Sequence, residues 1–214
     1  MQQYVEVPVS TGGVVRVARK ATDDDIRRAC EMTIHGRESK VNIRSLYRAE
    51  HSPIRCDVYW VELLGVPTAS SVHFVRHKLG VEHFVGSNRP DRPGGVFDPS
   101  DELLALAHMV IEFARSEECT DESLVKLRPL LDLVRNIPLT HGMHINAQAL
   151  ITMARKRLCH QADKTTVAWM EAIKEGVLQV KPDLAFYMQK MCDYRMGYCP
   201  ENKPCGDFKV KRVP

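Results

Sequence analysis

The sequence contains no run of about 18 consecutive apolar residues, which is the length that a membrane-spanning helix needs. Its first residues, MQQYVEVPVSTGG, include neither the basic segment nor the apolar segment of a secretory signal. We therefore expect a cytoplasmic protein that does not enter a membrane. Thiols stay reduced in that compartment, so the seven cysteines predict metal ligands or packed thiols rather than disulfides.

A strong charge of one sign is also lacking, since the formal net charge is +3 over 214 residues. So small an excess gives no general attraction for nucleic acid, and any anion site must be local. The sequence has no Walker loop, no G-x-G-x-x-G, no H-E-x-x-H and no G-x-S-x-G. Hydrophobic residues make up 44%, which is typical of a globular domain with its own core. We expect one domain over residues 1–206, followed by a basic tail at 207–214.

The pattern of polar and apolar residues predicts a mixture of strands and helices. Alternation at 4–9 and 14–20 predicts two strands joined by a turn, and the segment VEHFV (81–85) predicts a third strand. Residues 56–67 fit either a buried strand or a helix, because periodicity does not decide between them. Periodicity and capping residues predict helices over 23–36, 39–50, 67–78, 102–116, 122–135 with a break at Pro129, 146–159, 165–180 and 182–192.

The segment 72–92, VHFVRHKLGVEHFVGSNRPDR, gathers cations after a predicted helix end and in a predicted loop. These cations are Arg76, Lys78, Arg89 and Arg92. The planar guanidinium group can donate two parallel hydrogen bonds to a phosphate. Gly86 and Ser87 would let the backbone approach such an anion closely. The segment therefore predicts an anion site, and a solvated basic strip is an equally good interpretation.

The segment 146–162, NAQALITMARKRLCHQA, predicts a helix with polar groups on one face. The residues at helical spacing on that face are Asn146, Leu150, Met153, Arg157 and Gln161. An asparagine and an arginine among apolar neighbours can line a ligand site. The alternative is an ordinary helix whose Arg157 extends its charged end to water.

The cysteines near the end of the sequence suggest a metal site. Cys192, Cys199 and Cys205 have the spacing C-x6-C-x5-C, and Cys159 or His160 would supply a fourth ligand. Thiolates in a loop can hold zinc in a tetrahedral arrangement. The alternative is a set of thiols that only pack or lie in a loop.

Taken together, these motifs resemble the flavin-dependent thymidylate synthases, the ThyX family. That family has R-H-R followed by S-x-R, and RHK (76–78) and SNR (87–89) stand here in that order. The segments that match further elements of the family, in the same order, are EHSPIRCDVYW (50–60), VRNIPL (134–139), NAQALITMARKRLCHQA (146–162) and GYCPENKPCG (197–206). The resemblance spans about Glu50 to Gly206.

The resemblance implies an α/β (α+β) fold with a twisted antiparallel sheet flanked by helices. It also implies a homotetramer with active sites between subunits. In the family reaction, a one-carbon unit passes from methylenetetrahydrofolate to C5 of dUMP, FAD supplies the hydride, and NADPH regenerates the flavin. The cofactor carries most of that chemistry, while the protein positions and polarises.

Carried over to this sequence, the resemblance implies two sets of contacts. On the cofactor side, flavin or folate would contact Arg76, His77 and Lys78, and the flavin would also face His51, Asn146 and Gln161. On the nucleotide side, the contacts would come from His73, Gly86, Ser87, Arg89, Arg135 and Arg157. Arg157 would lie near the uracil and polarise C5, so Arg157 and Arg76 are the predicted catalytic residues. Arg19 lies outside these motifs and is expected to be a surface charge.

Two further interpretations stay open at this point. Lys78 stands where the family has an arginine, so a divergent member could act on another pyrimidine nucleotide or deliver a hydroxymethyl group to dUMP or dCMP. The other is a non-enzymatic module that binds nucleic acid or a protein partner through basic loops and a zinc-bound tail. The small net charge argues against it.

Overall fold

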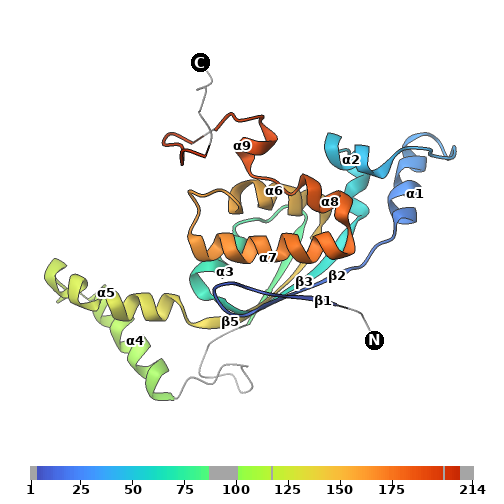
Figure 1. Ribbon diagram of the computed structural model, residues 1–214. Helices are drawn as coiled ribbons and strands as arrows, with labels where there is room; N and C mark the ends of the chain where they lie inside the picture. The colour runs from blue at the N-terminus through green and yellow to red at the C-terminus, as the bar shows by residue number, and fades with distance from the viewer. Residues whose placement is uncertain (1–3, 87–100, 117, 200, 208–214) are drawn as a thin grey trace.

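The computed structural model describes residues 4–86, 101–116, 118–199 and 201–207, without the side chains at 101–105, 107 and 130–135. Within these ranges the strands form a five-stranded antiparallel sheet in the order β1-β2-β3-β5-β4. The strands are β1 (Val5–Pro8), β2 (Val14–Arg19), β3 (Val58–Pro67), β4 (Val81–Val85) and β5 (Pro138–Asn146). An antiparallel sheet with helices around it is the fold class that the sequence predicted (Figure 1).

The helices connect and cover the strands. They are α1 (Asp23–Thr33), α2 (Ile43–Ala49), the 3-10 helix η1 (Ser52–Cys56), α3 (Thr68–Val75), α4 (Asp101–Arg115), α5 (Asp121–Arg135), α6 (Ala147–Arg157), α7 (Lys164–Val180), α8 (Pro182–Tyr187) and α9 (Met191–Tyr194). None of these helices is both long and apolar enough to cross a membrane.

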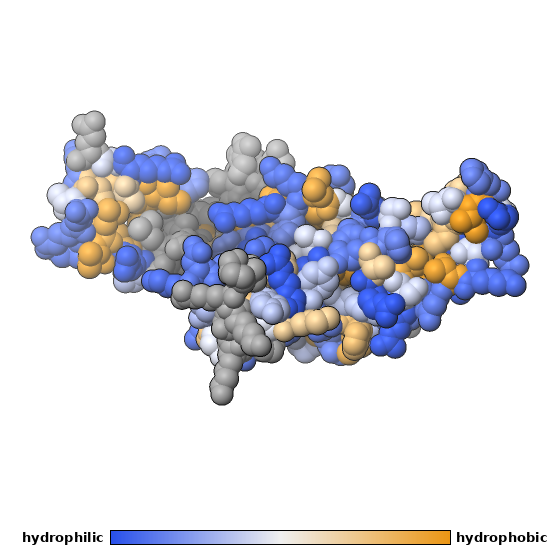
Figure 2. Space-filling model, turned by 90° about the horizontal axis from the view of Figure 1, so that it is seen from above, coloured by the Kyte–Doolittle hydropathy of each residue, from blue (hydrophilic) through white to orange (hydrophobic). Residues whose placement is uncertain are grey.

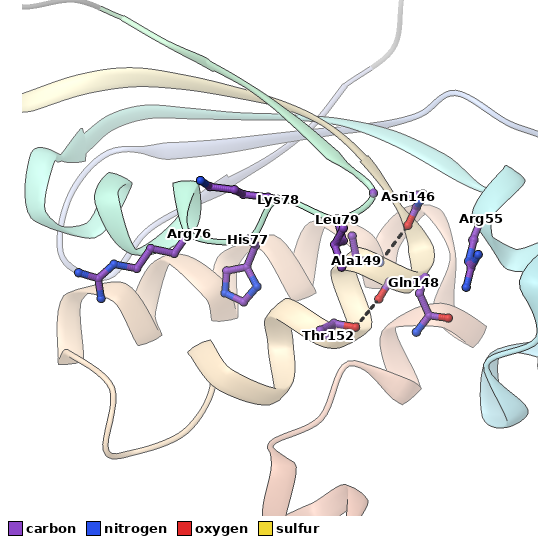
Figure 3. A pocket seen from close by; sticks show the side chains of 10 residues that line it. Arg55, Arg76, His77, Lys78, Leu79, Asn146, Gln148, Ala149 and Thr152 are labelled. Atoms are coloured by element: carbon purple, nitrogen blue, oxygen red, sulfur yellow. Dashed lines mark hydrogen bonds between the residues drawn. The ribbon is translucent and has the colours of Figure 1, made fainter.

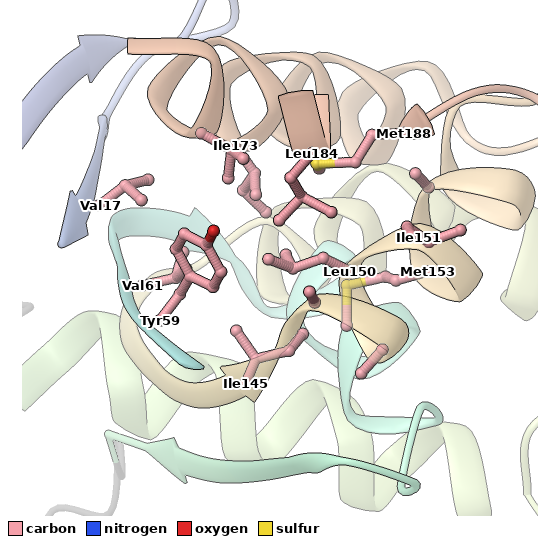
Figure 4. Packing of buried hydrophobic residues seen from close by; sticks show 14 of the residues in the cluster. Val17, Tyr59, Val61, Ile145, Leu150, Ile151, Met153, Ile173, Leu184 and Met188 are labelled. Carbon is pink, nitrogen blue, oxygen red and sulfur yellow. The ribbon is translucent and has the colours of Figure 1, made fainter. Parts of the chain in front are cut away.

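The core lies between the sheet and α7, with α6 and α8 beside it (Figure 4). Tyr59, Val61 and Leu63 alternate along β3 toward this layer, and each is fully buried. Gly176 of α7 faces Val17 of β2 so closely that an added Cβ would lie 2.5 Å from a Val17 methyl carbon. The absence of a side chain at Gly176 therefore allows α7 to pack directly on the sheet.

Most predicted elements are confirmed, with some differences. The ambiguous segment 56–67 contains strand β3, and its paired neighbours on both sides decide this. Helix α5 continues through Pro129, because a proline removes one hydrogen bond and can bend a helix without ending it. The predicted last helix is divided into α8 and α9.

Strand β5 was not predicted, although it is an inner strand of the sheet, between β3 and β4. Its sequence, PLTHGMHIN, contains a proline, a glycine and two histidines, which weaken a strand pattern. Its alternation is visible afterwards: Leu139, His141, Met143 and Ile145 are all buried. His141 therefore occupies a position that a strand normally gives to an apolar residue.

Arg19 is not the surface charge that the sequence suggested. It is 17% exposed, and its Nε donates to Oδ1 of the fully buried Asp57 at 2.7 Å. The hydroxyl groups of Tyr47 and Tyr59 each donate to Oδ2 of Asp57 at 2.6 Å. Burial, followed by the negative charge of Asp57, raises the pKa of both tyrosines. Arg19 is thus part of a buried network at the end of β2 and the start of β3.

Helices α4 and α5 form a hairpin that projects from the body of the molecule (Figure 1). Figure 2 shows apolar side chains at that end of the molecule. The large apolar residues exposed on the hairpin are Leu106, Met109, Phe113, Leu124 and Val125. Among the described residues α4 and α5 pack mainly on each other, and two helices packed in this way leave part of their apolar surface exposed.

Candidate functional site

A pocket of about 630 Å³ lies between the segment that follows α3 and the first turns of α6 (Figure 3). Its lining comes from three parts of the sequence that the fold brings together. These residues are Arg55 of η1, then Arg76, His77, Lys78, Leu79 and Gly80 after α3, and Asn146, Gln148, Ala149 and Thr152 at the start of α6. The size is that of a site for one small organic ligand.

The lining of this pocket is cationic. Arg55, Arg76 and Lys78 contribute positive charges, and none of the lining residues is an aspartate or glutamate. Within the described part of the chain, these three cations have no carboxylate partner within 4.0 Å. The start of α6 adds the positive end of the helix dipole. The pocket is therefore suited to an anion such as a phosphate.

Asn146 joins the two walls of the pocket. Its side-chain Oδ1 accepts from the backbone N–H of Ala149 at 2.9 Å and caps α6. Its own backbone N–H donates to the carbonyl of Gly80 at 2.9 Å. Gly80 has a φ of +74°, and an added Cβ would lie 2.6 Å from the Asn146 amide. Only glycine fits there, because the conformation is left-handed and the contact is close.

His77 and Arg157 meet in the same region. The Nε of Arg157 donates to Nε2 of His77 at 3.0 Å, so this nitrogen of His77 carries no proton. Burial, followed by the charges of Arg157 and His83, lowers the pKa of His77 to about 4. Burial and the nearby Arg76 also lower the pKa of Arg157. The Arg157 guanidinium beside a neutral imidazole leaves a positive charge that an anionic ligand would balance.

A series of hydrogen bonds lies behind His77. The His77 carbonyl oxygen is 2.7 Å from Nε2 of His83, and Nδ1 of His83 is 2.9 Å from Nε2 of His141. Nδ1 of His141 is in turn 3.0 Å from the hydroxyl of Ser71. His141 is fully buried, and burial followed by the charge of His83 lowers its pKa to about 4.

Glu50 lies behind Gln148, one of the residues that line the pocket. Gln148 donates to a Glu50 carboxylate oxygen at 2.6 Å, and Arg155 forms an ion pair with the same carboxylate. The guanidinium of Arg155 also lies over the ring of Tyr194, 3.7 Å from its centre. Burial alone would raise the pKa of Glu50, but the hydrogen bonds from Arg155 and Gln148 lower it. Gln148 is therefore held by the protein itself.

The structure brings together five of the predicted site residues. Arg76, His77, Lys78 and Asn146 line the pocket, and Arg157 contacts it through His77. Residues 76–78 lie about 70 positions before Asn146 and Arg157 in the sequence, and the pairing of strands β4 and β5 brings the two groups to one place.

Four other predicted site residues do not line this pocket. His51 is exposed before η1, and the Nδ1 of His73 lies 2.9 Å from the Thr166 hydroxyl on α7. Gln161 is exposed and donates to the carbonyl of Lys203 in the tail at 2.9 Å. Gly86 ends the β4 edge, where its N–H donates to the carbonyl of Thr140 at 2.7 Å.

Three predicted phosphate or nucleotide ligands lie outside the described residues or side chains. Ser87 and Arg89 belong to 87–100, and the side chain of Arg135 is among those left out. Their predicted roles stay predictions.

The four predicted metal ligands Cys159, Cys192, Cys199 and Cys205 do not form one cluster in the described part of the chain. Cys192 is buried in α9, where burial raises the pKa of its thiol, whereas Cys205 is exposed in the tail. The group whose ligand atoms lie within 4.8 Å of one another consists instead of His160, Cys205 and Asp207. Asp207 already accepts from Lys190 at 2.8 Å and pairs with His160 at 2.7 Å.

Several residues of the site were not singled out in the sequence. They are Arg55, Gly80, His83 and His141. The signal for the two histidines was their place in an alternating pattern, with His83 two residues after Val81 and His141 two residues before Met143. A histidine at an apolar position of a strand must find partners inside the protein. Arg55 and Gly80 gave no such signal, because only the tertiary structure places them at the pocket.

Comparison with solved structures identifies the architecture. This chain aligns with the UMP/dUMP methylase PolB from Streptomyces cacaoi, a structure bound with 5-Br dUMP, at a TM-score of 0.51 and 16% identity. The alignment covers 81% of this chain and 93% of PolB. The two proteins share a fold. No family model matches the sequence, and no curated protein matches it either.

A second solved structure gives a similar alignment. Thymidylate Synthase X (ThyX) from Helicobacter pylori, a structure with FAD and dUMP, aligns at a TM-score of 0.49 and 15% identity. The alignment covers 80% of this chain and 96% of that one. The fold shared with PolB agrees with the antiparallel sheet flanked by helices that the motif resemblance implied.

Proposed function

We propose that this chain is a flavin-dependent enzyme that transfers a one-carbon unit from methylenetetrahydrofolate to C5 of a pyrimidine nucleotide, most simply from dUMP to dTMP. One observation carries the proposal. Two motifs far apart in the sequence, Arg76–Lys78 and Asn146–Arg157, form one cationic pocket in a fold shared with a UMP/dUMP methylase. A pocket without carboxylates suits the phosphate of a nucleotide.

The chain's own residues have distinct proposed roles. Arg76 and Lys78, both exposed, attract and hold anionic groups of nucleotide, flavin or folate. Arg157 is less exposed than Arg76 and Lys78. Its guanidinium would stabilise the negative charge that develops on the pyrimidine ring when C5 attacks the one-carbon unit. His77 keeps Arg157 in place by accepting its Nε–H. Asn146 caps the first turn of α6 by accepting from the Ala149 N–H.

FAD fits the chemistry of this lining, because its pyrophosphate would meet cations and a helix N-terminus. When bound and reduced, it would supply the hydride, and NADPH would restore it. The pocket of about 630 Å³ has the size for one such ligand, not for nucleotide, flavin and folate together. We therefore propose that further walls of the site come from other copies of the chain, in a homotetramer.

The product assay tests the proposal. Purified protein is incubated with dUMP, methylenetetrahydrofolate, FAD and NADPH, and the nucleotide is analysed by mass spectrometry. A nucleotide heavier by one methyl group is the expected result. A protein that is colourless and also fails to bind added FAD would refute the proposal and favour a non-enzymatic module.

A second candidate is hydroxymethyl transfer to dUMP or dCMP. Two observations favour it: Lys78 offers a point charge where the family has a guanidinium fork, and Gln148 is held by Glu50 instead of being free for a ligand. In the same assay, a product heavier by a hydroxymethyl group would support this candidate over methylation. Parallel reactions with UMP and dCMP identify the preferred nucleotide.

A further inference from the structure

Three side chains from three different elements form a hydrogen-bonded series behind the pocket. Ser71 comes from α3, His141 from β5 and His83 from β4. The successive distances are 3.0 Å from Ser71 to His141, 2.9 Å from His141 to His83, and 2.7 Å from His83 to the His77 carbonyl. None of the three side chains lines the pocket itself.

The carbonyl at the end of the series fixes the direction of the first bond, and the other directions follow when His83 is neutral. A carbonyl oxygen only accepts, so Nε2 of His83 must carry a hydrogen. In a neutral His83, Nδ1 then accepts from Nε2–H of His141. Nδ1 of His141 is left to accept from the hydroxyl of Ser71. Each ring donates once and accepts once, so the series is complete with all three groups neutral.

Because Ser71 and His141 are buried, their hydrogen bonds must be formed within the protein. Ser71 is 2% exposed and His141 is fully buried, so water cannot replace a missing partner of either. An unpaired polar group in such a place is costly, and hydrogen bonds in a series support one another. The register of β4 on β5 places His83 opposite Met143, which puts His83 and His141 on the same face of the sheet.

We propose that Ser71, His141 and His83 are positioning residues for the pocket, forming a directional series of hydrogen bonds that fixes the backbone of His77. The inference rests on the proposed function, because it concerns the pocket proposed to bind the nucleotide. His77 is then held at two points: His83 holds its carbonyl, and its ring accepts from Arg157. Arg76 and Lys78 are its direct neighbours, so the same anchor places both cations.

The series does not deliver protons to the pocket. Its last acceptor is a carbonyl oxygen, which does not take up a proton under ordinary conditions, and the His77 ring is bonded to Arg157 instead. The role of the series is therefore to hold atoms in place. This distinguishes it from the acid–base arrangements that histidines and serines form in many enzymes.

The first test reads the hydrogens directly. NMR of the full chain labelled with ¹⁵N-histidine distinguishes Nδ1–H from Nε2–H in each ring. We expect His83 and His141 to be neutral at pH 7 with the hydrogen on Nε2. A charged His83, or a hydrogen on its Nδ1, would overturn the proposed direction, and this outcome does not depend on any substrate.

The second test uses three variants. His83→Ala removes the bond to His77, whereas His83→Gln keeps one acceptor and one donor in a neutral side chain. His144→Ala is the matched control, because His144 lies on the same strand as His141 but is exposed on the other face. Unfolding by urea is measured for each variant, so that loss of the fold is recognised.

We expect His83→Ala to shift the NMR signals of the His77 ring and to weaken dUMP binding by about tenfold. His83→Gln should retain most of the affinity, and His144→Ala should change neither signal nor affinity. Equal affinities for the alanine and glutamine variants, with an unchanged His77 ring, would overturn the inference. If the wild-type protein does not bind dUMP, the proposed function fails, while the His77 signals still test the anchor.

Discussion

At the scale of single residues, the contacts of the pocket converge on His77 and Arg157. Replacing Arg157 by alanine removes the donor to His77 and the deepest positive charge of the site. We expect Arg157→Ala and Arg76→Ala each to lower kcat/KM for dUMP by about two orders of magnitude, because a charged hydrogen bond to a ligand is lost. Arg27→Ala, on the exposed side of α1, is the control and should have no such effect. Equal losses in all three variants would contradict the site.

The lowered pKa values of His77 and His141 predict how stability depends on pH. Both fall to about 4, below the ordinary histidine value of 6.5. Between these two values the unfolded chain binds more protons than the folded one, so stability is full above pH 6.5 and decreases as the pH falls toward 4. The buried His141 alone could account for up to about 3 kcal/mol.

Urea unfolding at pH 7 and pH 4.5 measures this effect. The variant His141→Gln keeps a donor and an acceptor but does not titrate, so its loss of stability over this pH range should be smaller than that of the wild type. Carboxylates titrate in both proteins and cancel in the comparison. The same loss in wild type and variant would show that His141 does not titrate as expected.

Of the four predicted zinc ligands, Cys205 is the one that belongs to a group of potential metal ligands. It lies beside Asp207 and beside His160, which follows α6, while Cys192 is buried in α9. If zinc binds there, the zinc content of the purified protein should fall when Cys205 is replaced by serine and stay unchanged in Cys56→Ser, since Cys56 is equally exposed. A wild-type protein without zinc after growth in zinc-supplemented medium would refute the prediction.

At the scale of elements, β2 carries two arginines in opposite surroundings. Arg16 forms an ion pair with Glu6 in which both side chains are largely exposed, at 40% and 56%. Arg19 pairs with Asp57, which is fully buried. Arg19→Ala leaves a buried carboxylate without its cation, so we expect a loss of about 3 kcal/mol in the free energy of unfolding. Arg16→Ala should cost less than about 1 kcal/mol. Similar losses in both variants would contradict the buried network.

The elements also show where sequence reasoning ends. Thr22 and Asp25 form the capping box that opens α1, and such a local signal is readable from the sequence. Strand β5 is different, because its polar residues fit a strand only when β3 and β4 pair on either side. The pocket depends on β5, since this strand leads into Asn146 and α6.

At the scale of the whole molecule, the hairpin of α4 and α5 leaves apolar side chains open. Such a surface is typical of contact with another chain, and the proposed site also requires further walls. We expect light scattering to give a mass above 24.3 kDa, with four copies as the predicted assembly. Met109→Glu should reduce that mass.

Met32→Glu is the matched control for this experiment. Met32 on α1 is 67% exposed and Met109 is 61% exposed, so the two substitutions differ in place and not in exposure. The control should leave the mass unchanged. A wild-type protein that is monomeric at micromolar concentration would contradict both the assembly and the shared site.

The sequence by itself determined the residue types of the site and most helices, because capping, periodicity and motif order act over short distances. It predicted Arg76, His77, Lys78, Asn146 and Arg157 as site residues, and the structure brings these five together. Only the tertiary structure decided that β5 is an inner strand between β3 and β4, that Arg19 is buried, and that Ser71, His141 and His83 support His77. These facts depend on contacts between residues up to 88 positions apart, from Val58 to Asn146, and no local pattern contains that information.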